Sequence, residues 1–177
     1  MLFEKTRING IIIIRPKVFQ DERGYFVETF NQEKCPDDLK NINFVQDNES
    51  CSNYGVIRGL HFQEGTYAQA KLVRVIKGRV LDVVLDLRID SETYGQTFSI
   101  ELSGENKTQM FIPRGFAHGY SVLQDDSIFA YKCDNYYRKE TEKGINPMDS
   151  SLQIDWRIPR EHHIISEKDR AWPVLIK

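Results

Sequence analysis

Cysteine is scarce in this sequence, and the pairs that would give it a structural role are missing. The 177 residues hold only Cys35, Cys51 and Cys133, an odd number without any Cys-x-x-Cys pair. A disulfide framework and a zinc site built on paired cysteines both need such pairs. We therefore expect a protein that folds without disulfides in the reducing cytoplasm.

Long apolar runs and an excess of charge of one sign are also missing. The apolar run Ile11–Ile14 near the N-terminus is closed after four residues by Arg15-Pro16. It is too short for the hydrophobic region of a signal peptide or for a membrane span, so we expect no membrane partner. The 24 basic and 26 acidic residues give a net charge of −2, without the basic excess typical of nucleic-acid-binding proteins.

The composition that remains is that of an ordinary globular domain. Hydrophobic residues make up 40% and charged residues 28% of the chain, which excludes a wholly disordered protein. A length of 177 residues corresponds to about one domain. Because no repeat, low-complexity segment or linker divides the sequence, we expect a single domain over residues 1–177.

Short strand-like runs dominate the chain. Lys71–Ile76 and Arg79–Arg88 flank a short turn with Gly78, which predicts a β-hairpin. In the second run, leucine and valine at the odd positions share one face, while Asp82 and Asp86 lie among the valines of the other. This mixed face either meets solvent or lines a polar cavity.

The strand pattern continues beyond this pair of runs. Further strands are predicted at Thr97–Leu102, Thr108–Ile112, Gly119–Leu123 and Ile128–Cys133, with turn residues between them. Only Pro36–Lys40 and Pro159–Glu161 are candidates for single helical turns. Several short strands at regular spacing are typical of an all-β sandwich or a small barrel.

Two nearby segments carry candidate chemistry. Arg58-Gly59-Leu60-His61 joins a guanidinium, which suits an anion such as phosphate, to an imidazole, which suits proton transfer near neutral pH. The alternative is a surface arginine and a histidine satisfied in the core. Lys71 either ends a strand in water or, inside a barrel, directs its ammonium group at a developing oxyanion.

The spacing Pro113-x-Gly115-x-x-His118 resembles the second motif of cupin barrels. The first cupin motif normally contains His-x-His, but here Phe62-Gln63 follows His61. A metal site would then have too few ligands, because only two central histidines are available. The pattern favours a metal-free cupin over a metal enzyme.

Two later clusters also allow a structural and a chemical interpretation. Tyr131, Tyr136 and Tyr137 lie within seven residues of one another. They either pack in a strand, or one phenol donates a proton or stacks on a base or sugar. Ser166–Asp169 is, taken alone, a solvated run of charges.

Taken in order, these segments resemble one family along nearly the whole chain. The matching stretches are Asp21–Phe26, Phe44–Asn48, Arg58–Gln63, Ala68–Arg74, Ile112–Gly119, Tyr131–Cys133, Ile154–Trp156 and Ser166–Asp169. They resemble the dTDP-4-dehydrorhamnose 3,5-epimerases, the cofactor-free epimerases of the dTDP-L-rhamnose pathway, from about residue 10 to about residue 170.

This resemblance implies an all-β jelly-roll (cupin-type) β-barrel or sandwich with a few short helices, a homodimer, and no cofactor or metal. The implied substrate is dTDP-4-dehydro-6-deoxy-D-glucose, inverted at C3 and C5 to give dTDP-4-dehydro-L-rhamnose. Both carbons lie next to the C4 ketone, so each proton can leave if the resulting enolate is stabilised.

The resemblance also assigns the proton-transfer residues. His61 matches the base of the family, and Asp169 matches the carboxylate that orients this imidazole, as in hydrolase triads. Tyr131 matches the acid that reprotonates from the opposite face. Lys71 matches the cation that stabilises the enolate.

The remaining matches are expected to bind substrate. They are Arg23, Glu28, Gln46, Asn48, Arg58, His118, Tyr137, Glu142 and Lys168. The two arginines match pyrophosphate or sugar contacts, and Asp82 is expected to hydrogen-bond His118. In several family members the N-terminal segment crosses the dimer, so Arg23 and Glu28 are expected to serve the partner's site.

The sequence departs from the family in two loops and leaves further functions open. Glu64–Tyr67 stands in place of a proline-rich loop, and Ile145–Asp149 replaces the commoner Ile-x-Trp-Asn-Asp pattern. These departures concern loop shape and sugar tolerance. The competing functions are a 3- or 5-epimerase of a related dTDP-deoxysugar, a 3,4-ketoisomerase, a non-catalytic nucleotide-sugar-binding cupin and a metal cupin oxygenase.

Overall fold

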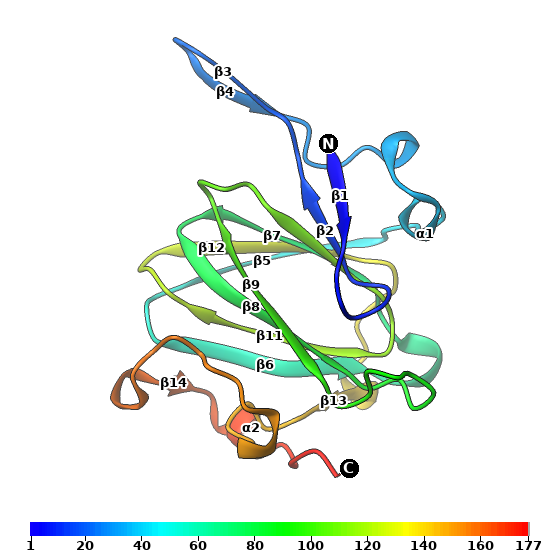
Figure 1. The fold of residues 1–177 in the computed structure, drawn as a ribbon. Helices are drawn as coiled ribbons and strands as arrows, with labels where there is room; N and C mark the ends of the chain where they lie inside the picture. The colour runs from blue at the N-terminus through cyan, green and yellow to red at the C-terminus, as the bar shows by residue number, and fades with distance from the viewer. Residues whose placement is uncertain (177) are drawn as a thin grey trace.

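Two β-sheets face each other in the computed structural model, which describes residues 1–176 (Figure 1). The first, sheet I, has the strand order β1-β2-β10-β7-β12-β5. Its strands are β1 (Leu2–Lys5), β2 (Ile12–Arg15), β10 (Gln109–Ile112), β7 (Lys71–Lys77), β12 (Ser127–Cys133) and β5 (Gln46–Ser52). All of its neighbouring strands pair antiparallel.

The second, sheet II, has the strand order β13-β6-β11-β8-β9. Its strands are β13 (Glu142–Gly144), β6 (Val56–Gln63), β11 (Phe116–Val122), β8 (Arg79–Asp86) and β9 (Thr97–Ser103). The short strand β14 (Ile164–Ile165) runs parallel to β6 beside this sheet. The strands predicted between residues 97 and 133 are confirmed, and β11 begins at Phe116, so that His118 lies inside it.

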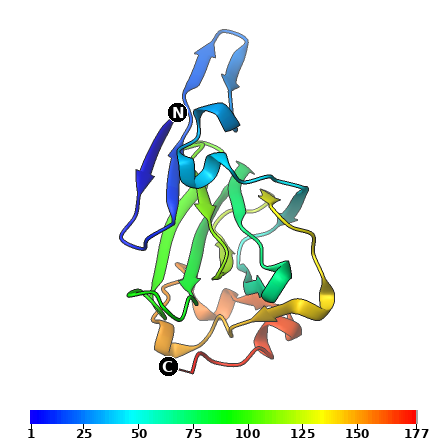
Figure 2. The same ribbon diagram turned by 90° about the vertical axis from the view of Figure 1, so that its right-hand side faces the viewer.

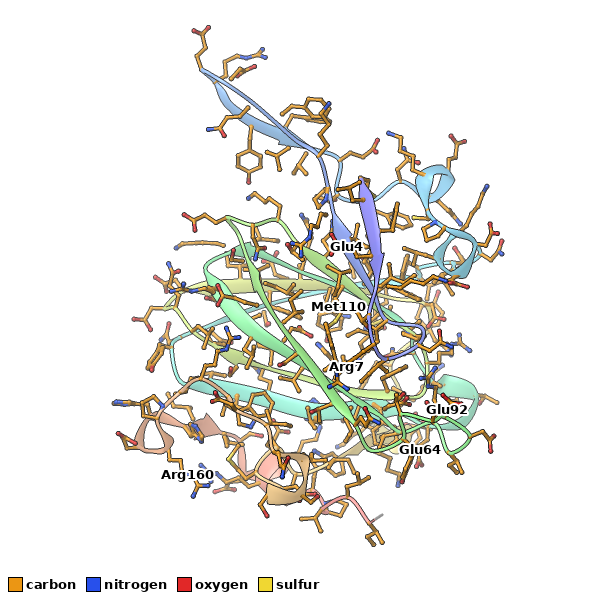
Figure 3. The ribbon with its side chains drawn as sticks, in the orientation of Figure 1. Glu4, Arg7, Glu64, Glu92, Met110 and Arg160 are labelled. Atoms are coloured by element: carbon orange, nitrogen blue, oxygen red, sulfur yellow. The ribbon has the colours of Figure 1, made fainter. Side chains whose placement is uncertain are left out.

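An apolar core fills the space between the sheets. It takes side chains from both of them, among which are Val73 and Val75 on β7, Val80 and Val84 on β8, and Phe129 on β12. Figure 3 shows Met110 between the sheets, whereas Glu64, Glu92 and Arg160 lie at the surface. Burying this apolar surface, at about 25 cal/mol per Å², holds the two sheets together.

The predicted hairpin between β7 and β8 is wrong. β7 pairs with β10 and β12 in sheet I, and β8 pairs with β11 and β9 in sheet II. Gly78 has a φ of +78°, and a Cβ added there would lie 2.2 Å from Ser127 Oγ. The glycine therefore allows a tight corner at which the chain leaves one sheet and enters the other.

The period-2 pattern of β8 nevertheless holds. Its odd positions pack on a second apolar cluster formed with residues 145–158, which cover the outer face of sheet II. Its even positions point between the sheets, so the interpretation of the mixed face as solvent-facing is wrong. Asp82 and Asp86 are both 0% exposed.

Helices are few and short. The α-helices are α1 (Asp37–Lys40) and α2 (Glu167–Arg170), and the 3-10 turns are η1 (Gln32–Lys34), η2 (Gly65–Tyr67), η3 (Lys139–Thr141), η4 (Ser150–Leu152) and η5 (Arg160–His162). The two predicted helical turns correspond to α1 and η5. None of the helices in residues 1–176 is long and apolar enough to cross a membrane.

A two-stranded arm extends away from the sheets. It consists of β3 (Val18–Asp21) and β4 (Gly24–Val27), which pair only with each other. Figures 1 and 2 show it pointing away from the sandwich, on the side opposite the C-terminal segment. Its Phe19 and Phe26 are 52% and 68% exposed, so the arm carries apolar surface that this chain does not cover.

Candidate active site

A cavity of about 650 Å³ lies between the two sheets. Its lining includes Arg58 and His61 from β6, His118 and Tyr120 from β11, Lys71 from β7, Tyr131 from β12, Asn48 and Ser50 from β5, and Lys168 and Asp169 from α2. The four residues expected to transfer or stabilise charge thus share one cavity, although they lie far apart in the sequence.

His61 and Asp169 form a hydrogen-bonded pair. His61 Nε2 lies 2.6 Å from Asp169 Oδ1, and the Asp169 side chain is only 6% exposed. Because Nε2 faces the carboxylate, the neutral imidazole carries its proton there and keeps its lone pair on Nδ1. The pairing expected from the sequence is therefore present.

Several contacts keep the Asp169 carboxyl ionised. Burial acts to raise its pKa, but the hydrogen bond and charge of His61 outweigh this effect and lower the pKa below the ordinary value. The Gly59 backbone N–H also donates to Asp169 Oδ2 at 3.3 Å. Ser166 caps α2 by accepting a hydrogen bond from the Asp169 backbone N–H, which fixes the start of this short helix.

Gly59 lets β6 approach β11 closely beside His61. Its φ is +117°, and a Cβ there would lie 2.6 Å from Gly119 Cα and 2.7 Å from the His118 carbonyl oxygen. Any larger residue would push the two strands apart. Gly59 thus helps to set the position of the imidazole.

Lys71 stands on the opposite wall, at the start of β7. It lines the cavity, so the interpretation of this lysine as a strand end in open water is wrong. Burial lowers the pKa of its ammonium group, while the charges of Cys133, Asp82 and Glu142 act to raise it. Its Nζ lies 5.8 Å from the centre of the Tyr131 ring.

Tyr131 shares that wall on β12. Burial raises the pKa of its phenol to about 12, so the hydroxyl keeps its proton at neutral pH. Sheet I carries Tyr131 and Lys71, and sheet II carries His61. A ligand in the cavity would therefore lie between an imidazole on one side and a phenol and an ammonium on the other.

A second histidine–aspartate pair lies beside the first. His118 is the register partner of His61, and its Nε2 is 3.0 Å from each carboxylate oxygen of Asp82. The hydrogen bond expected between these residues is therefore present. Burial raises the pKa of Asp82, and the contact with His118 opposes that rise.

The polar residues near the cavity mouth hold one another in place. Arg58 donates from Nε and a terminal NH2 to Ser52 Oγ at 3.3 and 3.1 Å. Gln46 Nε2 donates to Asn48 Oδ1 at 3.0 Å, and Gln46 Oε1 accepts from the backbone N–H of Tyr137. These contacts connect the start of β5 to the loop after β12.

Glu142 joins that loop to α2. It accepts a hydrogen bond from the Tyr137 hydroxyl at 2.7 Å and pairs with Lys168 Nζ at 2.6 Å. The hydrogen bond to Glu142 raises the pKa of Tyr137 to about 12. All three residues are expected from the sequence to bind substrate, and the structure brings them together beside the cavity that Lys168 lines.

The family model described as dTDP-4-dehydrorhamnose 3,5-epimerase matches residues 5–177 of this chain. Over 174 residues the chain is 50% identical to the dTDP-4-dehydrorhamnose 3,5-epimerase of Methanothermobacter thermautotrophicus, covering 98% of this chain and 94% of that relative. The chain belongs to this family. The resemblance seen in the sequence motifs is thereby confirmed.

Solved structures of the family share the fold. The dTDP-4-dehydrorhamnose 3,5-epimerase of Elizabethkingia anophelis has a TM-score of 0.92 and 53% identity, covering 98% of this chain and 96% of that one. The dTDP-6-deoxy-D-glucose-3,5-epimerase of Legionella pneumophila, in complex with dTDP-4-keto-L-rhamnose, has a TM-score of 0.92 and 44% identity, covering 98% and 92%. The expected jelly-roll fold of the cupin type is therefore confirmed.

Two expected site residues of this family member lie outside its own cavity. Arg23 sits at the tip of the arm, 84% exposed in its side chain and paired with Asp21. Glu28 follows β4 and pairs with Lys34. Arg23 lies between β3 and β4, which project from the sandwich (Figure 1), and neither Arg23 nor Glu28 is among the residues that line the cavity of His61.

Tyr120 and Ser50 are among the cavity residues that are absent from the set expected from the sequence. Tyr120 lies two positions after His118 on the same strand face, and its hydroxyl is 2.8 Å from Ser50 Oγ. The period-2 rule applied from His118 would have found it. Ser50 lies on β5, which the sequence did not predict, so no signal pointed to it.

The two loops that depart from the family have distinct places. Residues 64–67 include the 3-10 turn η2 at the surface, and residues 145–149 follow β13 and contact the segment after α2. Among residues 1–176, no three histidine, cysteine, aspartate or glutamate side chains are grouped so that they could hold a metal ion.

Proposed function

We propose that this chain epimerises dTDP-4-dehydro-6-deoxy-D-glucose at C3 and C5 to give dTDP-4-dehydro-L-rhamnose. One observation carries the proposal: a carboxylate-paired imidazole faces a buried phenol and an ammonium group across a single cavity. Substrate and product are isomers, so no net oxidation occurs and no redox partner is consumed. What the site must supply is proton transfer and charge stabilisation.

His61 is the proposed base. Its Nδ1 takes a proton from a carbon next to the C4 ketone, and the electron pair moves into the ketone to form an enolate. Asp169 holds Nε2–H and stabilises the imidazolium that forms, because its carboxyl is ionised at neutral pH. General-base catalysis of this kind contributes about 100- to 10,000-fold.

Lys71 is the proposed partner of the enolate oxygen. A cation fixed in a water-poor cavity stabilises developing negative charge more than the same cation in water does. Burial lowers the pKa of this lysine, and the carboxylates of Asp82 and Glu142 counteract that effect by favouring its charged form. The two carboxylates thus help to keep the ammonium cationic.

Tyr131 is the proposed acid. It donates its proton to the enolate carbon from the face opposite His61, which inverts the configuration at that carbon. A phenol whose pKa is raised to about 12 arrives protonated and takes its proton back readily afterwards. Before the second inversion, the His61 imidazolium releases its proton to water and the Tyr131 phenolate takes one up. The same cycle at the second carbon then completes the double inversion.

The polar mouth of the cavity is the proposed nucleotide end. Arg58, held by Ser52, suits the pyrophosphate as a fork-shaped donor. The remaining proposed contacts are Gln46, Asn48, Tyr137, Glu142 and Lys168 around the mouth, with His118 in the sugar pocket.

We further propose a homodimer in which the arm reaches the partner's cavity. The exposed Phe19 and Phe26 supply apolar surface for such a contact. Arg23 and Glu28, which do not line their own cavity, would then lie at the partner's nucleotide end. A dimer of this kind in the cytoplasm agrees with Cys35, Cys51 and Cys133, all of which are free thiols.

Proton NMR of dTDP-4-dehydro-6-deoxy-D-glucose with the pure protein in deuterated water tests the proposal. We expect both the H3 and the H5 signals to disappear, and a coupled NADPH-dependent reductase to consume the L-rhamno product. Loss of one signal alone would instead indicate a single-centre epimerase. No loss at either carbon, together with tight dTDP binding, would indicate a binding module.

Two cheaper measurements test for a ketoisomerase and for a metal cupin. A 3,4-ketoisomerase would move the carbonyl from C4 to C3, which carbon NMR of the same reaction detects. Metal analysis of the purified protein tests for a metal cupin: stoichiometric iron or zinc whose removal abolishes turnover would contradict the proposed mechanism.

A further inference from the structure

The segment after α2 docks on the turn that follows β13. The Asn146 backbone N–H donates to the Pro173 carbonyl at 2.8 Å, and Asn146 Nδ2 donates to the Arg170 carbonyl at 3.0 Å. The Leu175 backbone N–H donates to Asp149 Oδ2 at 2.7 Å. The turn that departs from the family pattern therefore clamps residues 170–175.

Trp172 lies in this clamped segment and packs beside the proposed base. Gly144, the register partner of His61, leaves room for the indole: a Cβ there would lie 2.5 Å from Trp172 Nε1. The His61 and Trp172 rings meet edge to face, with centres 6.5 Å apart. Lys168 Nζ, one residue before Asp169 in the chain, lies 5.9 Å from the centre of the indole.

The helix that carries Asp169 needs such anchors. α2 spans only four residues, Glu167–Arg170, and a helix of this length has no independent stability. Its position must be set by what holds the chain on either side. β14 fixes the chain before it by pairing with β6, and the contacts of Asn146 and Trp172 fix the chain after it.

We propose that Trp172 and Asn146 are positioning residues that hold Asp169 against His61. This inference rests on the proposed role of His61 as the base. Trp172 acts by its shape, because its indole N–H is buried and has no hydrogen-bond partner among residues 1–176. Asn146 acts by its two hydrogen bonds, one to the carbonyl of Arg170 at the end of α2 and one to the carbonyl of Pro173 after it.

Steady-state kinetics of Trp172→Ala and Trp172→Phe test the inference. We expect Trp172→Ala to lower kcat about 10- to 100-fold, since misplacing a catalytic group by about 1 Å costs that much, with KM nearly unchanged. Trp172→Phe keeps a flat aromatic ring while losing the unpartnered N–H and part of the ring volume, so it should retain clearly more of kcat than Trp172→Ala. An equal loss in both variants, or no loss in Trp172→Ala, would overturn the inference.

Two further variants guard against a trivial loss of folding. Asn146→Ala keeps Trp172 but removes the side-chain clamp, and should lower kcat in the same direction. Val174→Ala changes a 55% exposed residue of the same segment and should leave both kinetic constants as they are. If Val174→Ala and Asn146→Ala lowered kcat equally, the loss could not be assigned to the hydrogen bonds of Asn146.

A double-mutant cycle shows whether Trp172 acts through Asp169. In an Asp169→Ala background, Trp172→Ala should cause no further loss, because the carboxylate that it positions is gone. A full additional loss would mean that Trp172 acts by another route and would contradict the inference.

Nitrogen NMR of the ligand-free protein gives a readout independent of epimerisation. The Asp169 contact should hold neutral His61 with its proton on Nε2 in the wild type, and Trp172→Ala should increase the fraction protonated on Nδ1. An unchanged fraction would overturn the inference. If the wild type failed to epimerise the sugar, the proposed function would fall, while this tautomer shift would still show whether Trp172 positions Asp169.

Discussion

Two histidine–aspartate pairs lie side by side in one cavity and differ in almost every physical respect. His61 is 29% exposed in its side chain and takes its carboxylate from the C-terminal segment, whereas His118 is 7% exposed and takes its carboxylate from a neighbouring strand. The pKa of Asp169 is lowered, and the pKa of Asp82 is raised by burial. Residue type alone therefore does not distinguish the two pairs, whereas exposure and the source of the carboxylate do.

The difference follows from where each aspartate sits. Asp82 lies in the middle of β8, is 0% exposed and directs both of its carboxylate oxygens at one histidine, so desolvation dominates. At Asp169, burial acts to raise the pKa, but the hydrogen bond and charge of His61, with smaller contributions from the Gly59 backbone N–H and Ser166, outweigh it and lower the pKa. One pair is suited to changing its charge during turnover, and the other to holding a fixed arrangement.

Removing each imidazole should give the largest contrast. We expect His61→Ala to lower kcat by about 1000-fold or more, because it removes the proposed base, with dTDP affinity nearly intact. His118→Ala should lower kcat by only about tenfold, because it removes a contact rather than a proton acceptor. Single-turnover kinetics and calorimetric titration with dTDP measure both effects, and equal losses in kcat would abolish the distinction between the pairs.

Tyr131→Phe, on the cavity wall that faces His61, separates abstraction of the substrate proton from reprotonation of the enolate. We expect net inversion to fall about 100-fold or more, since the proposed acid is lost, while hydrogen exchange with deuterated water continues at a reduced rate. NMR follows both in one sample. If exchange stopped completely while substrate binding was normal, Tyr131 would be required for abstraction as well, and the two walls would not divide the work.

Replacing the carboxylates of Asp169 and Asp82 tests the difference between the two histidine–aspartate pairs further. Asp169→Asn keeps the shape of the side chain but loses the charge that stabilises the imidazolium, so kcat should fall about 100-fold or more. Asp82→Asn keeps a hydrogen-bond acceptor for His118 and should cost about tenfold or less. The ratio of the two kcat values is the measurement, and a larger loss in Asp82→Asn would reverse the assignment.

The smallest effects are expected in the pH dependence of stability. The folded-state pKa of Asp169 lies below its ordinary value of 3.8, so its contribution is present above that pH and is lost as pH falls through the folded-state pKa. The folded-state pKa of Asp82 lies above 3.8, so its contribution is present below that pH and is lost as pH rises through the folded-state pKa.

Thermal melts of the two asparagine variants therefore should deviate from wild type in opposite directions. As the pH is lowered, the Tm of Asp169→Asn should fall less than the Tm of the wild type. As the pH is raised, the Tm of Asp82→Asn should fall less than the Tm of the wild type. Each kcal/mol of pH-dependent unfolding free energy that is lost corresponds to about 2–4 °C in Tm. Parallel curves for both variants and the wild type would show that neither carboxyl changes its pKa on folding.

The sequence was informative where periodicity and motifs coincide. The strands after residue 96 follow from alternation and turn residues, and the alternation of β8 assigns its two faces correctly. The cavity residues come from ordered motifs rather than from any local pattern. His61 and Asp169 are in contact although they are 108 positions apart in the sequence, and no periodic pattern relates residues at that separation.

The prediction of a β7–β8 hairpin failed because the same local sequence pattern is compatible with two topologies. Two apolar runs around a glycine look the same whether they pair or turn a corner between sheets, and only the close contact of Gly78 with Ser127 distinguishes them. Ser166–Asp169 looks like a solvated charge run because its one buried member is defined by tertiary contacts. The contact of Trp172 with His61 could not be predicted from the sequence, because the segment after α2 has no regular secondary structure and therefore no periodic pattern.

The arm has a consequence for how subunits depend on one another. Because it holds Arg23 out of reach of the His61 in the same chain (Figure 2), the proposed dimer makes each complete site from two chains. Mixing Arg23→Ala with His61→Ala subunits would then create sites with neither lesion: in a random equimolar mixture, about a quarter of all sites join an intact His61 to an intact Arg23. Two impaired preparations would then regain activity when they are mixed. The regained activity would measure the fraction of sites that combine residues from two chains.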